Sequence, residues 1–163
     1  MPVTSSGLAA QQWTYLTNLL RTEANPSGRL PTVQAVAKSY QLWMAASPQI
    51  GVQFESAVES KLGQRRHLVT TQFVVVVGVQ SKANPANLDD AMAQVMAIVE
   101  DENTLTHGIA PILRDTATYG LGGRTITSGI TKIETHGEVK PGASAEIWAY
   151  CDITFVTTTE VAI

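Results

Sequence analysis

The closing stretch of the chain, residues 145–161, has the sequence AEIWAYCDITFVTTTEV. Apolar side chains occupy one parity of this stretch, and polar side chains alternate with them on the other. Successive side chains of a β-strand point to opposite faces of the sheet, so the alternation predicts a long antiparallel strand with one face on a core. The apolar parity comprises Ile147, Ala149, Cys151, Ile153, Phe155 and Val161.

Three residues of this stretch, Trp148, Tyr150 and Val156, are apolar on the polar parity. They predict a second apolar patch, which needs a cover from a helix of the same chain or from another subunit. A long terminal strand with two apolar sides favours a sheet that is used for assembly rather than for chemistry.

The composition points the same way. A length of 163 residues predicts a single domain, residues 1–163, with room for a core. Only 15% of the residues are charged, against about a quarter in an average domain, which favours a protein packed against copies of itself or other subunits. The net charge of −3 argues against binding nucleic acid through a basic face. No apolar run approaches the roughly 18 residues that span a bilayer, and we recognise no secretion signal, so we expect cytoplasmic synthesis and no membrane partner.

Apolar spacing predicts further elements along the chain. We expect helices from Ser5 or Ser6 to Arg21 and from an Asn87 cap to about Asn103. A short helical turn is expected within residues 104–113, and a flexible turn over residues 119–123. Strands are expected over residues 50–59, 68–80 and 125–138, with a bulge at Gly129 and a hairpin loop from His136 to Gly142.

Residues 32–46 allow two interpretations. Their apolar residues recur at helical intervals, which favours an amphipathic helix, whereas the competing interpretation is an extended connection that crosses the sheet. With the helix preferred, the element order predicts an α+β fold with a four-stranded, mainly antiparallel sheet and helices packed on one face.

No arrangement of residues predicts catalysis or a cofactor. His67, His107 and His136 lie on different predicted elements without ligand-like spacing, which argues against a metal site. Cys151 has the core parity, so we expect an inert buried thiol. The neighbouring Asp89 and Asp90 point about 100° apart on a helix, so helix-dipole stabilisation explains them better than a shared site. The glycine-rich residues 119–124 lack the lysine and the Ser/Thr of a phosphate loop.

Several segments resemble the tail terminator (tail completion) proteins of long-tailed bacteriophages, small α+β proteins that form a six-fold ring. The matching segments are PQIGV at 48–52, FVVVV at 73–77, the acidic helix from Asn87 and, best of all, WAYCDITFVTT at 148–158. The resemblance covers about two thirds of the chain, from residue 48 onward. Residues 32–46 depart from it, because this region tends to be extended in the family.

The resemblance implies a structural virion protein rather than an enzyme, without cofactors. Such a protein would form a homo-oligomeric, hexameric ring that caps the tail tube, stops its elongation and offers a surface for joining the head. Its partners would be copies of itself, the tail tube protein and head–neck connector proteins. DNA would pass through without tight binding, and assembly would take place in the host bacterial cytoplasm. The alternatives are another phage neck, head-completion, tube or baseplate component, and, in a different class, a ligand-binding module or an enzyme with an unrecognised site.

Subunit contacts are the candidate sites. The apolar candidates are the second face of the last strand and the stretch around Phe54 and Val58. The charged candidates are an acidic cluster, residues 100–102, that would meet the basic pair Arg65 and Arg66 on a neighbouring subunit. A solvated helix end is the simpler explanation of the acidic cluster. The full set is Phe54, Val58, Arg65, Arg66, Glu100, Asp101, Glu102, Trp148, Tyr150 and Val156.

Overall fold

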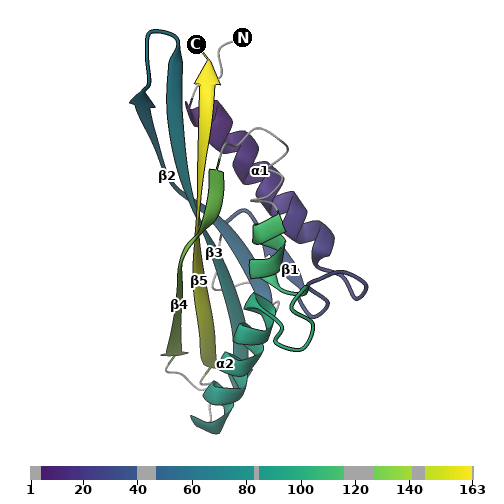
Figure 1. Cartoon of the computed structure of the whole chain (residues 1–163). Helices are drawn as coiled ribbons and strands as arrows, with labels where there is room; N and C mark the ends of the chain where they lie inside the picture. The colour runs from purple at the N-terminus through teal and green to yellow at the C-terminus, as the bar shows by residue number, and fades with distance from the viewer. Residues whose placement is uncertain (1–4, 40–46, 83–84, 116–126, 141–145, 163) are drawn as a thin grey trace.

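The computed structural model describes residues 5–39, 47–82, 85–115, 127–140 and 146–162, and shows one sheet with helices packed against it (Figure 1). The elements in chain order are α1 (Ser5–Glu23), β1 (Ala35–Ala37), β2 (Gln49–Lys61), β3 (Arg66–Lys82), α2 (Pro85–Val99), β4 (Thr127–Lys140) and β5 (Glu146–Ala162). Residues 109–115 are also helical, which confirms the helical turn expected in this connector.

The sheet has the strand order β1-β2-β3-β5-β4, and all its pairs are antiparallel except β1 with β2. The α+β class, the hairpin of β2 and β3, and the packing of helices on one face are therefore confirmed. The expectation of four strands was wrong, because a short fifth strand, β1, makes the sheet mixed.

This fifth strand lies inside the segment for which we preferred a helix. Residues 35–37 are extended and pair in register with residues 49–51 of β2, so the helical interpretation was wrong there. The guanidinium of Arg21 also donates to the Val36 carbonyl, with 3.0 Å between Nη2 and the oxygen. Both contacts are made by residues outside the segment, and the spacing of apolar residues within the segment gives no information about them. Residues 40–46 lie outside the described residues, as does the turn expected at 119–123.

The boundaries of several elements also differ from expectation. Helix α2 begins at Pro85, two residues before the expected cap at Asn87, and it ends at Val99 rather than near Asn103. Proline suits the first helical position because its fixed φ is already helical and no N–H is lost. Strand β4 runs to Lys140, so His136 and Gly137 are paired residues and not a loop.

Two register shifts interrupt the regular pairing of the strands. One lies in β4 between Ile130 and Lys132, just beyond the bulge expected at Gly129, and the other lies in β2 between Phe54 and Ser56. Each extra residue inverts the parity of the strand beyond it. In β2 the shift puts Val58 on the opposite face from Phe54.

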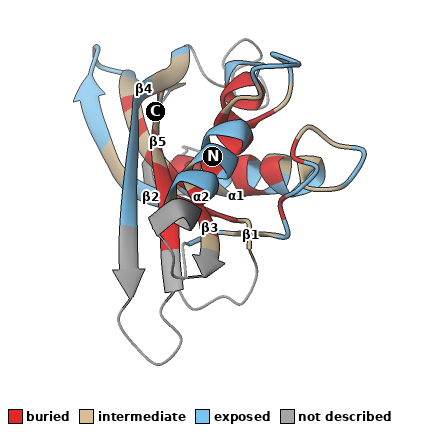
Figure 2. Cartoon of the chain, turned by 90° about the horizontal axis from the view of Figure 1, so that it is seen from below, coloured by how far each residue is buried: buried red, intermediate tan, exposed pale blue. Residues whose placement is uncertain are grey.

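The core lies between the helices and one face of the sheet (Figure 2). The expected parity of β5 is confirmed, since Ala149, Cys151, Ile153 and Phe155 are all fully buried. The β3 residues paired with them share this face, and α1 and α2 complete the cluster with Leu16, Leu20, Ala91 and Val95, among others. We call this the covered face of the sheet, and the other the second face.

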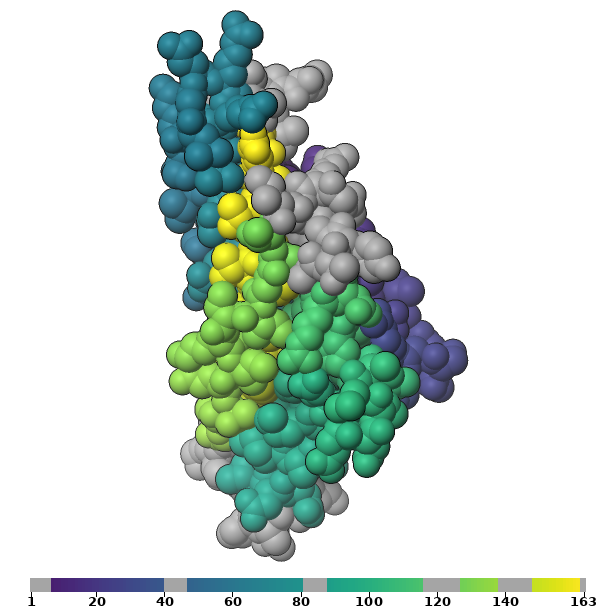
Figure 3. Space-filling model, viewed as in Figure 1, coloured from purple at the N-terminus to yellow at the C-terminus, as the bar shows by residue number. Residues whose placement is uncertain are grey.

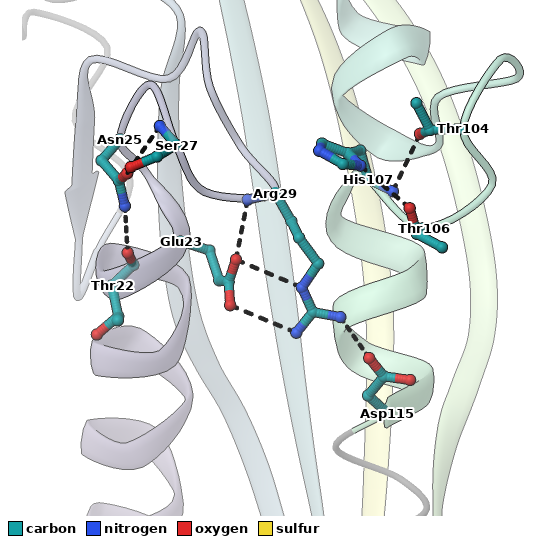
Figure 4. Close-up of polar contacts among 9 residues, drawn as sticks. All are labelled: Thr22, Glu23, Asn25, Ser27, Arg29, Thr104, Thr106, His107 and Asp115. Atoms are coloured by element: carbon teal, nitrogen blue, oxygen red, sulfur yellow. Dashed lines mark hydrogen bonds and ion pairs between the residues drawn. The ribbon is translucent and has the colours of Figure 1, made fainter.

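Polar contacts attach the helical residues 109–115 to the loop after α1 (Figure 4). Arg29 bridges Glu23 of α1 and Asp115, and its carbonyl accepts from Gly108 N at 3.0 Å. Gly108 has a φ of +112°, and a Cβ there would lie 2.7 Å from the Val99 carbonyl oxygen. A glycine is therefore required where the chain after α2 turns back towards the core.

Candidate functional site

At one end of the second face, the side chains of β5 are buried within the chain itself. Trp148 and Tyr150 are only 2% and 4% exposed, and they form a small cluster with Val76 and Val74. Their rings stack with centroids 6.0 Å apart and planes 8° apart, and Tyr150 also packs on the His136 ring. Trp148 and Tyr150 are therefore packed within their own chain, which leaves them little exposed area for the subunit contact proposed from the sequence. The alternation of β5 assigns them to a face, but it does not tell what lies over that face.

The middle of the second face is an open, polar hollow of about 500 Å³. It is lined by side chains from all four long strands: Glu55, Gln72, Val74, Thr131, Lys132, Glu134, Asp152 and Thr154. Most of its charged groups have a partner nearby. Lys132 Nζ lies 2.9 Å from Glu134 Oε2, Gln72 donates to Glu55, and His136 Nε2 lies 3.9 Å from Asp152 Oδ1.

Three pKa values in the hollow are shifted from their ordinary values. The hydrogen bond between Lys132 and Glu134 raises the pKa of the ammonium and lowers that of the carboxyl group. Partial burial raises the pKa of Asp152, and the nearby His136 opposes the change. Such a raised carboxyl pKa is also found in general acids. Here the acidic groups each have a polar neighbour and lie in an open hollow, an arrangement typical of a solvated sheet surface.

The outer end of the second face is open. Val58 is 60% exposed on β2, and Val156 of β5 is half-buried on the same face. Between them lie Thr70 and Thr158, whose Oγ1 atoms are 3.5 Å apart. This end of the face is therefore a mixture of aliphatic groups and hydroxyls, without a cover from any described helix.

Phe54 lies on the covered face instead. Its ring packs against those of Trp13 and Phe73, each with a centroid distance of 6.1 Å, and it remains 40% exposed. It thus supports the docking of α1 on β2, to which Trp13 also contributes by donating from Nε1 to the Val52 carbonyl at 2.7 Å.

The tip of the β2–β3 hairpin holds the basic pair. Arg65 and Arg66 are exposed, and Arg66 Nη1 lies 3.1 Å from Glu160 Oε1 of β5. Leu62 is also exposed at this tip, with 55% of its surface accessible. The tip projects from one end of the sheet, away from α2 (Figure 3).

The acidic cluster follows α2. Arg114 Nη1 lies 2.6 Å from Glu100 Oε1, and Asp101 accepts from the Asn103 backbone N–H at 2.9 Å, whereas Glu102 is exposed. The cluster borders a groove of about 580 Å³ between α2 and β4. Sequence reasoning missed the exposed apolar residues of this groove, Met96, Leu105 and Ile133, because each follows a pattern that fits a core position or a loop.

Other candidate chemistry finds no support in the described part of the chain. Among those residues, no group of three or more His, Cys, Asp or Glu side chains is placed to hold a metal ion. Cys151 is a free, fully buried thiol, as expected, and burial raises its pKa to about 11. Its thiolate, which is the nucleophilic form, is therefore suppressed at neutral pH.

Comparisons with known proteins give no family. No protein-family model matches the sequence, and no curated protein matches it either. None of the helices in the described ranges has the length and apolar character that crossing a membrane requires.

Proposed function

We propose that this protein is a structural subunit of a phage tail, which assembles into a ring that caps the tail tube. The ring would stop elongation of the tube and present its other surface to head–neck connector proteins. The proposal begins from the sequence resemblance, and the open outer end of the second face supports it. Val58 gives the strongest support from that face, because 60% of this apolar side chain is exposed on a long strand.

Most of the exposed apolar residues gather at two places. The described residues leave seven large hydrophobic side chains exposed: Tyr15, Phe54, Val58, Leu62, Met96, Leu105 and Ile133. Val58 and Leu62 lie on the outer half of the β2–β3 hairpin. The groove between α2 and β4 is lined by Met96, Leu105 and Ile133. Apolar groups gathered at two separate places are typical of subunit contacts.

The charge pattern agrees with a ring through which DNA slides. With a net charge of −3, the chain has no excess of the Lys and Arg that neutralise phosphates and hold DNA tightly. A passage for a moving genome requires weak binding. We propose that the virion, assembled in the bacterial cytoplasm, is where this protein acts.

Electron microscopy of particles produced without this protein tests the proposal. We expect overlong tails, or tails not joined to heads, and rescue by the gene supplied in trans. Tails of normal length with unfilled or leaking heads would instead assign the protein to the neck, the alternative position. Normal, infectious virions would overturn the structural role altogether.

A further inference from the structure

The groove between α2 and β4 has an apolar interior that no described residue fills. Met96 of α2 and Ile133 of β4 are each 43% exposed, and Leu105 is 69% exposed. Ala93 and Ala97 also line the groove, and their small side chains leave space beside Met96. The volume of about 580 Å³ is enough for one or two side chains of a partner.

Leu105 lies at this groove in an unusual backbone conformation. Its φ is +57°, in the left-handed region that a leucine rarely adopts, and its N–H donates to the Asp101 carbonyl oxygen at 2.9 Å. For a residue with a side chain, the left-handed conformation costs about 1–2 kcal/mol of conformational free energy. Leu105 is the exposed, large apolar side chain of this turn, and it lines the groove.

The border of the groove is negatively charged. Three carboxylates, Glu100, Asp101 and Glu102, follow one another there, and Arg114 pairs with Glu100. Glu102 is exposed, so its charge is available to a partner. An apolar interior with an acidic border suits a partner segment that carries an aliphatic side chain beside basic ones.

The tip of the β2–β3 hairpin has this composition. Leu62 is exposed there, and Lys61, Arg65 and Arg66 surround it in the sequence. In its own molecule the tip projects from the end of the sheet opposite α2 (Figures 1 and 3), whereas the groove is lined by residues of α2, of the loop that follows it and of β4. The tip therefore reaches a groove only in another copy.

We propose that the β2–β3 hairpin tip of one copy docks in the groove between α2 and β4 of the next copy. Leu62 enters beside Met96 and Leu105, and Arg65 meets the carboxylate of Glu102. This contact joins two different surfaces, so each added copy still offers a free tip or a free groove, and the series ends when a ring closes. The inference rests on the proposed function, for which it names the subunit contact.

Charge reversal is the first test. We expect Arg65→Glu and Glu102→Arg each to weaken self-association about 10- to 100-fold in analytical ultracentrifugation, because like charges then face each other. The double variant should recover most of the loss. Lys38→Glu and Asp89→Arg, which reverse exposed charges outside both surfaces, are the matched controls and should leave association unchanged.

Cross-linking tests the same contact even if free copies associate weakly. L62C and L105C chains, mixed at high concentration with a short bismaleimide, should give a mixed dimer at least about tenfold faster than L62C with Y15C chains. Cys151 is buried and should not react in the folded chain. Equal cross-linking in the two mixtures would overturn the inference.

The two proposals fail in different ways. Rings that assemble normally from both charge-reversed variants would refute this contact and leave the proposed function intact. Normal virions produced without the protein would refute the proposed function, whatever the cross-linking shows.

Discussion

Gln12 of α1 and Thr159 of β5 are joined by a buried hydrogen bond, in which Gln12 Nε2 donates to the threonine Oγ1 at 3.1 Å. The same amide accepts from Thr157 Oγ1, also at 3.1 Å. All three side chains are buried, so one glutamine satisfies two hydroxyl groups on the covered face of the sheet. The polar end of β5, which by pattern alone could face solvent, is thereby attached to α1.

Removing this amide should destabilise the fold. We expect Gln12→Leu to lower the free energy of unfolding by about 2–3 kcal/mol, because two buried hydroxyls lose their partner. Urea denaturation followed by circular dichroism measures the change. Asn18→Ala, on the exposed side of the same helix, should change stability by no more than about 0.5 kcal/mol. An unchanged midpoint for Gln12→Leu would show that the hydroxyls find other partners.

The burial of Trp148 within the chain predicts a large effect on an isolated copy. We expect Trp148→Ala to cost about 3–5 kcal/mol of unfolding free energy in urea titrations at concentrations where the protein is monomeric. Leu62→Ala, at the exposed hairpin tip, should cost little under the same conditions. If Trp148→Ala were harmless in the monomer and weakened only the assembled form, the indole would be an interface residue after all.

Gly108 and Gly63 provide a matched pair of glycines. Gly108→Ala should cost about 1–3 kcal/mol, because φ is +112° and the added methyl would meet the Val99 carbonyl oxygen. Gly63→Ala should be close to neutral, since no atom lies within 4 Å of a Cβ at that position. Thermal unfolding of both variants gives the comparison, and equal melting temperatures would contradict it.

The buried thiol of Cys151 predicts a loss of stability in alkali. Burial raises its pKa from 9.0 to about 11, so the folded chain keeps a proton that the unfolded chain releases. The stability that the protonated thiol contributes is complete below pH 9 and is lost as the pH rises through 9 towards 11. At about 1.36 kcal/mol per pKa unit, the loss of unfolding free energy is about 2–3 kcal/mol.

Urea titrations from pH 7 to 11 measure this loss. Cys151→Ala should start from a lower stability at pH 7, because it removes buried sulfur, but it should lose less between pH 9 and 11. Parallel curves for the two proteins would show that other groups cause the alkaline loss. A thiol reagent at pH 8 provides an independent check, because it should modify the native chain only as fast as the chain unfolds.

The alternation of residues 145–161 determined the strand, its length and the face that meets the core. The reason is physical: the period of two along a strand is a local property, and burial of one face selects the apolar parity. The same logic gave β2, β3 and α2, with shifts of a few residues at their ends, where caps and turns compete with the pattern.

Contacts between distant residues decided the rest. Residues 35–37 are extended because β2 pairs with them, and the side of the sheet on which Val58 lies depends on a register shift in β2. Trp148 and Val156 share a parity, yet the fold buries one and leaves the other half-exposed. A single strand specifies which side chains share a face, but what covers that face depends on how the whole chain packs.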